Sequence, residues 1–191
     1  KGVIRIAGDC FYSDAAIFSF HPVKHIACGE GGMITTNSDD IYHKLSLLRT
    51  HGITKDPEIL SSNDGGWYYE MVELGYNYRL TDFQAALGTT QLQKLKSSLN
   101  VRNKIALRYD ELFDELGWKH QTVPTDYFHA HHLYVIEHPD RKKMYDFLKE
   151  KGIYAQVHYI PVHMQPYYQY LGWNKGDMPN AETNYSRCLS L

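Results

Sequence analysis

The stretch "FSFHPVKHIACGEGG" places one lysine, Lys24, between an apolar run and a group of glycines. Pro22 fixes the backbone just before this lysine, and Gly29, Gly31 and Gly32 allow another group to approach the backbone closely after it. A partly buried lysine loses its charge readily and can then attack a carbonyl carbon. The context therefore favours a nucleophilic lysine over the alternative, an ordinary solvated side chain.

A hydroxyl group precedes Lys24 in the same stretch. Ser19 lies within the apolar run, where a hydroxyl needs a polar partner, and that partner could be a phosphate. An imine-forming lysine and a phosphate anchor are the minimal requirements for binding pyridoxal 5′-phosphate (PLP), which we predict as the cofactor. A nucleotide-binding loop is a weaker interpretation, because "GEGG" matches neither common glycine pattern and comes before a strand.

Two other stretches gather side chains that could bind a ligand. Residues 157–168, "VHYIPVHMQPYY", combine histidines, tyrosines and prolines, which favours a rigid hydrogen-bonding wall for a sugar over ordinary aromatic packing. The stretch "HAHH" holds His129, His131 and His132, of which the first two would share one face of a strand. No carboxylate lies nearby, so we predict no metal site.

The composition excludes several classes of protein. With 191 residues, a net charge of −2 and a pI near 6.6, the chain has no bulk charge for binding nucleic acid or a membrane surface. The three cysteines form no CxxC pattern, which argues against a disulfide framework and fits a reducing cytoplasm. No apolar run approaches the length of a membrane span.

These residues must be positioned by regular elements, and the first part of the chain has an α/β pattern. Apolar and β-branched runs predict strands over 13–20, buried on both faces in a parallel or mixed sheet, and over 31–37. Asn37 is the expected N-cap of a helix that ends before Gly52. The apolar pattern then disappears over 53–80, which predicts a functional loop or an interface.

The second part of the chain begins with helices. Thr81 and Gln84 form a capping-box signature for a helix over 81–95, and a second helix is expected up to Gly117. A strand over 131–138, a helix over 139–152 and a strand over 153–160 follow. We expect two domains, 1–95 and 96–191, the second a smaller α+β domain.

Four motifs resemble those of a known family. "FSFHPVKHIACGEGGMITTN", "LLRTHGI", "LGYNYRLTDFQAALG" and "GIYAQVHYIPVH" are together similar to the DegT/DnrJ/EryC1/StrS sugar aminotransferases, in family order and over most of the chain. The resemblance implies an α/β fold of the type I PLP-dependent aminotransferase class. Within the family, "VHYIPVHMQPYY" followed by "GDMPNAE" looks most like the transaminases of pseudaminic acid synthesis.

The resemblance also assigns residues to the cofactor. Lys24 matches the lysine that holds the cofactor as an imine and moves protons, and Ser19 matches the serine that binds its phosphate. Asn77 matches an asparagine that reaches the phosphate from the neighbouring subunit, which implies a homodimer with shared active sites.

Further positions are assigned to the substrate. The resemblance places Tyr78, Arg79, His158, Tyr159 and His163 at the sugar site. It implies transfer of an amino group, with glutamate as the expected donor, to a 4-keto-6-deoxy nucleotide sugar in the synthesis of cell-surface polysaccharide or glycan precursors. The alternatives are a 3-keto sugar aminotransferase and a non-catalytic fragment that keeps the fold.

The chain departs from the family in its extent. The early strands of the large domain, a phosphate loop, the aromatic residue that stacks on the cofactor ring and the acid that pairs with its nitrogen would lie upstream. We also expect the last part of the small domain to be absent from this sequence. We therefore expect residues 1–95 to be the C-terminal part of the large PLP-binding domain, and 96–191 a truncated small domain.

Overall fold

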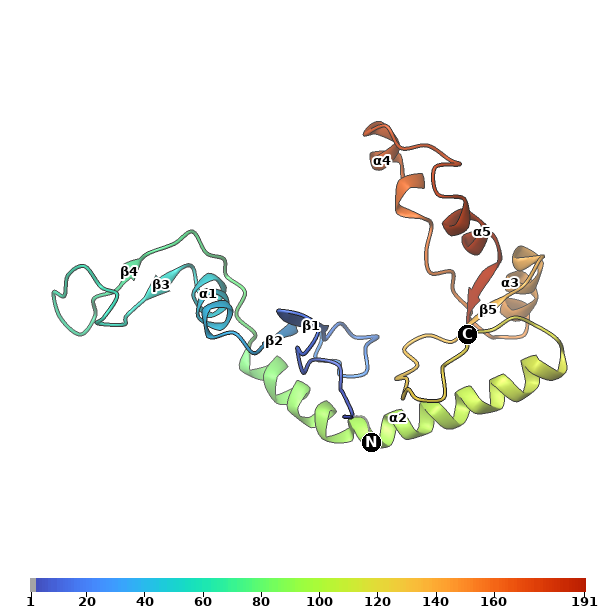
Figure 1. Ribbon diagram of the computed structural model, residues 1–191, viewed down its shortest axis with the longest axis horizontal. Helices are drawn as coiled ribbons and strands as arrows, with labels where there is room; N and C mark the ends of the chain where they lie inside the picture. Colours follow the sequence, from blue (N-terminus) through green and yellow to red (C-terminus); the bar gives the residue numbers. More distant parts are fainter. Residues whose placement is uncertain (1–2) are drawn as a thin grey trace. The chain divides into compact units, whose positions relative to one another are not determined.

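The computed structural model describes residues 3–191 (Figure 1). The chain divides into two compact units, one running up to Leu95 and the other comprising Lys96–Leu191. Each unit has its own small sheet or sheets, and the units are described separately below. Across residues 3–191, every helix is either too short or too polar to traverse a lipid bilayer.

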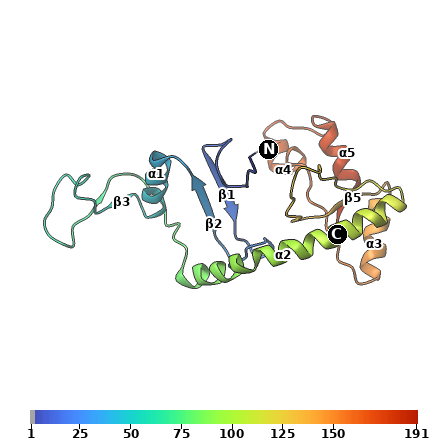
Figure 2. The same ribbon diagram turned by 60° about the horizontal axis from the view of Figure 1, so that its bottom comes forward.

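The first unit contains an antiparallel strand pair, β1 (Ala15–Ser19) and β2 (Gly32–Thr36), which lie side by side in Figure 2. Both strands fall where the sequence predicts them. The expectation that the first strand is buried on both faces in a parallel or mixed sheet is wrong for the described residues. There, β1 pairs only with β2, and Ile17 is 80% exposed because no layer covers its face.

Helix α1 (Asp39–Arg49) follows β2, and its N-cap is Ser38 rather than the predicted Asn37. The Ser38 hydroxyl oxygen accepts the Ile41 N–H at 3.3 Å, as an N-cap should. The Asn37 side chain is used elsewhere, since its Nδ2 donates to the Asp9 carbonyl at 2.8 Å.

The segment after α1 is mostly irregular, as predicted, but it contains a short antiparallel pair. The two strands are β3 (Ile53–Thr54) and β4 (Glu70–Met71). The intervening loop is fixed by Glu70, whose carboxylate accepts the backbone N–H groups of Ser61 and Ser62 and the Tyr68 hydroxyl.

One continuous helix, α2 (Asp82–Glu115), replaces the two helices expected over this region. The sequence between the two apolar stripes, "KSSLNVRN", contains no glycine or proline, so nothing ends the helix there. The predicted capping box is confirmed: Thr81 Oγ1 accepts the Gln84 N–H at 3.3 Å, and Gln84 Oε1 accepts the Thr81 N–H at 3.1 Å.

The second unit pairs β5 (Val135–Glu137) with β6 (Cys188–Ser190) in an antiparallel sheet. Its helices are α3 (Arg141–Glu150), the 3₁₀ turn η1 (Val162–Met164), α4 (Pro166–Tyr170) and α5 (Pro179–Arg187). The core contains Ala106, Phe113, Tyr134, Ile136, Ala155 and Leu189.

Both strands predicted for this unit need correction. The first is shorter than 131–138, because His131 has a positive φ of 48° that interrupts extended backbone before Val135. The second, over 153–160, does not form: only Gln156 pairs there, through a single antiparallel bridge to Ser190. Its apolar side chains are largely solvent-facing, and Tyr154 is 79% exposed.

Candidate functional site

Lys24 lies in a compact turn that directly follows β1. Buried Phe20 closes this turn, since its N–H donates to the Gly31 carbonyl at 2.9 Å and its carbonyl accepts the Cys28 N–H at 3.0 Å. The Lys24 N–H donates to the His21 carbonyl at 2.9 Å, and the residue is half-buried. The backbone of the turn is therefore held at both ends, with the lysine between them.

Ser19 ends β1 on the same turn and is exposed. Its hydroxyl oxygen accepts the His21 N–H at 3.4 Å, which leaves the hydroxyl proton for donation to another acceptor. A hydroxyl donor and an amine on one short, anchored turn fit the phosphate and the aldehyde of PLP in residue type and in sequence order.

The glycines after Lys24 connect this turn to the start of α2. A Cβ on Gly31 would come within 2.7 Å of the Leu80 side chain, so a larger residue would displace that contact. Gln84 Nε2 donates to the Glu30 carbonyl at 2.9 Å. The lysine turn and the "YRLTDFQ" segment are thus neighbours in the structure.

Asn77 lies in an extended segment that pairs with the end of α1. It forms an antiparallel bridge with Thr50, and the next residue, Tyr78, donates its N–H to the Arg49 carbonyl at 3.0 Å. On the other side, the His51 N–H donates to the Tyr76 carbonyl at 2.8 Å. This pairing brings "LLRTHGI" and "LGYNYRL" together and leaves the Asn77 side chain exposed.

The neighbours of Asn77 are fixed by side-chain contacts. The rings of Tyr76 and Tyr78 stack with centroids 4.9 Å apart and planes 7° apart. Arg79 Nη1 lies 2.9 Å from His51 Nε2, and arginine can only donate, so this His51 nitrogen is the acceptor. The predicted substrate residues Tyr78 and Arg79 are both exposed on this segment.

The other predicted substrate residues lie in the second unit. His158 Nδ1 is 2.9 Å from the hydroxyl oxygen of Ser190, a residue 5% exposed in β6. Tyr159 follows it and is 73% exposed, with its ring set edge-on to the imidazole. The "VHYIPVH" segment thus presents an aromatic hydroxyl next to an anchored histidine.

His163 is buried in η1 and tied to another helix. Its Nε2 lies 2.8 Å from Oε1 of Glu182 in the first turn of α5, and the same oxygen accepts the Gly176 N–H at 2.6 Å. The hydrogen bond from His163, followed by that from Gly176, lowers the pKa of Glu182. His163 therefore ties η1 to the first turn of α5.

Sequence reasoning missed the partners that hold these histidines. Glu182 follows Pro179, a helix-start signal that places an acid in the first turn, so its position could have been noticed. Ser190 gave no signal, because its pairing with His158 joins residues far apart in the chain. His51, in the motif "LLRTHGI", has no predicted role, and its Nε2 accepts a hydrogen bond from Arg79.

The histidine stretch outside this site forms a small ring contact. His129 and His131 have ring centroids 4.6 Å apart and lie outside any strand, so the shared strand face is wrong. Within residues 3–191, no three side chains of His, Cys, Asp or Glu gather as a metal-binding group.

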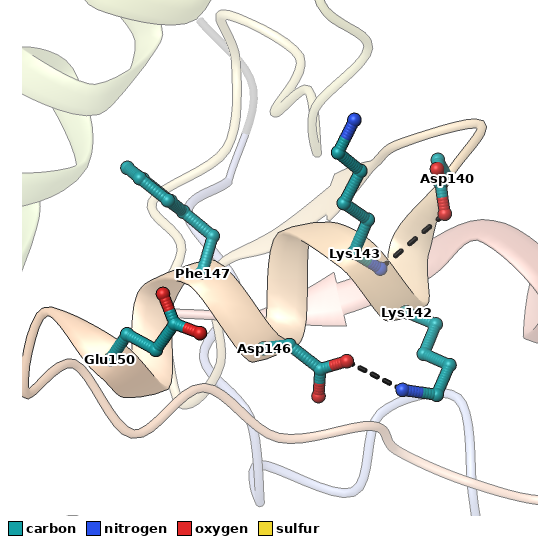
Figure 3. A pocket seen from close by; sticks show the side chains of 6 residues that line it. All are labelled: Asp140, Lys142, Lys143, Asp146, Phe147 and Glu150. Carbon is teal, nitrogen blue, oxygen red and sulfur yellow. Dashed lines mark hydrogen bonds and ion pairs between the residues drawn. The ribbon is translucent and has the colours of Figure 1, made fainter.

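Figure 3 shows an open hollow along α3 that none of the predicted site residues line. Its lining residues are Asp140, Lys142, Lys143, Asp146, Phe147 and Glu150. Lys142 Nζ pairs with Asp146 Oδ2 at 2.5 Å, and the Lys143 N–H donates to the Asp140 cap. The hollow is an ordinary charged helix surface.

Solved structures share this fold. The PLP form of the putative sugar aminotransferase Spr1654 from Streptococcus pneumoniae matches with a TM-score of 0.84 at 28% identity, over 96% of this chain and 47% of that one. Helicobacter pylori PseC, described as an aminotransferase involved in pseudoaminic acid biosynthesis, matches with a TM-score of 0.83 at 32% identity, over 94% and 48%. The fold is therefore that of PLP-dependent sugar aminotransferases, as predicted.

The sequence comparison agrees and is more specific. Residues 7–191 match the DegT/DnrJ/EryC1/StrS aminotransferase family, and the chain belongs to it. PLP is thus confirmed as the cofactor of the family, consistent with the PLP and pyridoxamine phosphate (PMP) forms of Spr1654.

Curated relatives include two bacterial proteins. The spore coat polysaccharide biosynthesis protein SpsC of Bacillus subtilis is 41% identical over 93% of this chain and 48% of its own length. A UDP-4-amino-4,6-dideoxy-N-acetyl-beta-L-altrosamine transaminase of Campylobacter jejuni is 37% identical over 94% and 47%. The chain spans about half the length of the curated relatives it matches.

Proposed function

We propose that this chain is part of a PLP-dependent enzyme that transfers an amino group from glutamate to a 4-keto-6-deoxy nucleotide sugar. The observation that carries the proposal is the anchored turn after β1, which holds the Ser19 hydroxyl and the Lys24 amine five positions apart. The family membership gives that pair its chemical meaning.

Each residue of the turn has a distinct task. Ser19 would donate a hydrogen bond from its hydroxyl group to the cofactor phosphate. Lys24 would hold the cofactor through its Nζ. Its free amine would act as a proton carrier that takes a proton from the donor's Cα and later delivers one to C4 of the sugar. When bound, PLP supplies the electron sink that makes these protons removable.

The substrate assignment rests on the second unit and on the relatives. Within the second unit, His158, Tyr159 and His163 would bind the sugar. Tyr78 and Arg79 of the first unit are also proposed to bind substrate. The name of the C. jejuni relative is that of a transaminase of a UDP-linked 4-amino-4,6-dideoxy sugar, and PseC is named for pseudoaminic acid biosynthesis. The first name supports amination at C4, and the name of SpsC, a spore coat polysaccharide biosynthesis protein, supports a role in surface glycan precursors. We also propose a cytoplasmic location, because the three cysteines are free thiols, as a reducing compartment allows.

We further propose a homodimer in which Asn77 reaches the cofactor phosphate of the partner. Its exposed position on a paired, extended segment supports this role, because the side chain is free of the ladder that fixes its backbone. We also propose that residues 1–95 belong to the large domain and 96–191 to the small one, which the division into two compact units at Leu95 supports.

The test uses the intact protein with PLP, glutamate and a UDP-linked 4-keto-6-deoxy sugar. The expected results are a visible absorption band of the bound cofactor, a borohydride-reducible link at Lys24 and a product carrying its new amine at C4. Lys24→Ala should abolish turnover and the link, whereas Lys55→Ala, in an exposed loop, should change neither. An amine at C3 would instead favour a 3-keto sugar aminotransferase, and a chain without band, link or turnover would be a non-catalytic relative.

A further inference from the structure

The second unit contains a histidine outside the proposed site whose two ring nitrogens both face acceptors. The His120 side chain is only 8% exposed. Its Nε2 lies 3.0 Å from Asp114 Oδ1. Its Nδ1 lies 3.2 Å from the Gln121 carbonyl oxygen and 3.2 Å from Asp110 Oδ1.

This geometry decides the protonation of the ring. A carbonyl oxygen can only accept a hydrogen bond, so Nδ1 must carry a proton. The ionised carboxylate of Asp114, 75% exposed, also accepts only, so Nε2 must carry a proton too. A neutral imidazole has a single N–H and would aim one lone pair at an oxygen, which is repulsive. Only the imidazolium satisfies both contacts.

The ring also sits where it joins two parts of the unit. His120 follows α2, stacks on Tyr134 with centroids 6.1 Å apart and planes 12° apart, and forms an antiparallel bridge with Ile136 of β5. Around it, the Gln121 N–H donates to the Val135 carbonyl at 3.0 Å, and the Glu137 N–H donates to the Lys119 carbonyl at 2.8 Å.

We propose that His120 is a buried imidazolium that latches the last turns of α2 to β5, so that the attachment depends on a proton. The charged groups facing the ring are Asp110 and Asp114 of α2. From the other side comes Tyr134, whose hydroxyl donates to Asp110 at 2.6 Å and is neutral. The ammonium of Lys119, the residue before His120, lies 3.9 Å from Glu137 Oε2.

The electrostatics agree with the geometry. The hydrogen bond that His120 donates to Asp114 is the largest effect that raises the pKa of His120, and it outweighs the burial that lowers it. Because the pKa of His120 is raised, its attachment of α2 to β5 is fully present below the ordinary histidine pKa. The attachment is lost as pH rises through the raised pKa. The second unit should therefore loosen as pH rises through the raised pKa of His120.

The test is nitrogen-15 NMR of the histidine rings in the intact protein across pH 5 to about 9, around the ordinary histidine pKa. At neutral pH, His120 should show two protonated ring nitrogens, and the resonance is assigned by its loss in His120→Gln. Asp114→Asn should reduce the proton affinity of His120 roughly tenfold, the order expected for one charged hydrogen bond. Glu111→Gln, an exposed neighbour on α2, is the matched control and should leave it unchanged.

A second readout reports the latch itself. The protection factors of the Gln121 and Glu137 amides, which are corrected for the intrinsic exchange rate at each pH, should fall as His120 deprotonates. Asp114→Asn should move that change to lower pH. A single proton on His120 at neutral pH, or an Asp114→Asn variant with unaltered titration, would overturn the proposal. Neither result bears on Lys24 chemistry, so the proposed function stands or falls separately.

Discussion

The backbones of Gly52 and Gly75 lie against each other. A Cβ on Gly75 would come within 2.2 Å of the Gly52 nitrogen, and one on Gly52 would come within 1.8 Å of the Glu73 carbonyl oxygen. This contact fixes the spacing between the end of α1 and the segment that carries Asn77. The two glycines of "LLRTHGI" and "LGYNYRL" are thus explained by one close approach.

Gly75→Ala should therefore destabilise the first unit. The new methyl group would meet backbone atoms that cannot move aside, and overpacking of this kind costs about 1–3 kcal/mol. For a chain of this size, each kcal/mol lowers the melting temperature by roughly 2–4 °C. The matched control is Gly66→Ala, since a Cβ there meets nothing within 4 Å. Equal melting temperatures for the two variants would contradict the close contact.

Asn77→Asp should inactivate the enzyme by placing a carboxylate against the cofactor phosphate of the partner subunit. Lys24→Ala should also be inactive. After subunit exchange between the two variants, about half of the dimers are mixed, and each has one site with neither lesion, so activity should return to roughly a quarter of wild type under two-fold symmetry.

The controls for this mixing experiment are each variant alone and the exchange itself, followed by mass. Exchanged dimers that remain inactive would show that Asn77 acts within its own subunit. Recovery without detectable exchange would point to a contaminating wild-type enzyme.

Ser190→Ala should weaken the sugar site without unfolding the second unit. Removing the hydroxyl leaves His158 Nδ1 without its partner at 2.9 Å, a loss of about 1 kcal/mol. We expect a higher KM for the keto sugar with kcat largely kept, and a changed tautomer ratio of His158 by NMR. Ser186→Ala, an exposed hydroxyl of α5, serves as the comparison. If KM stays constant while the tautomer ratio changes, His158 is not at the substrate.

The loop held by Glu70 should persist in acid. Hydrogen bonds from the Ser61 hydroxyl and N–H, then from Tyr68, lower the pKa of Glu70 to about 2. A lowered pKa means that the hold is fully present above the ordinary glutamate pKa and is lost as pH falls toward 2. Amide protection at Ser61 and Ser62 should follow that course and be absent in Glu70→Gln. Glu58→Gln, in the same loop, should retain wild-type protection.

The lysine turn shows how far local sequence reasoning reaches. Ser19, Lys24 and the glycines were found from a stretch of 15 residues, because a strand end, a proline and a glycine cluster are local signals. The capping box of Thr81 and Gln84 was found for the same reason. Resemblance to the family supplied the roles of Asn77 and His158, which spacing alone did not give.

The contacts between distant segments could not be predicted from the sequence. The continuity of α2 is a different case, because the absence of glycine and proline from its middle is visible in the sequence. The loss of the strand over 153–160 depended on which partner was available, since a strand needs a neighbour to accept its hydrogen bonds.

The sequence by itself determined the family, because Lys24, the serine before it and the family motifs are local and ordered along the chain. Only the tertiary structure decided which groups hold the side chains in place. Ser190 meets His158 and Glu182 meets His163 through folding, and His120 finds two acceptors at once. The first two pairings join residues 32 and 19 positions apart in the chain. The energies of all these contacts depend on burial and direction, which the spacing of residues in the sequence does not encode.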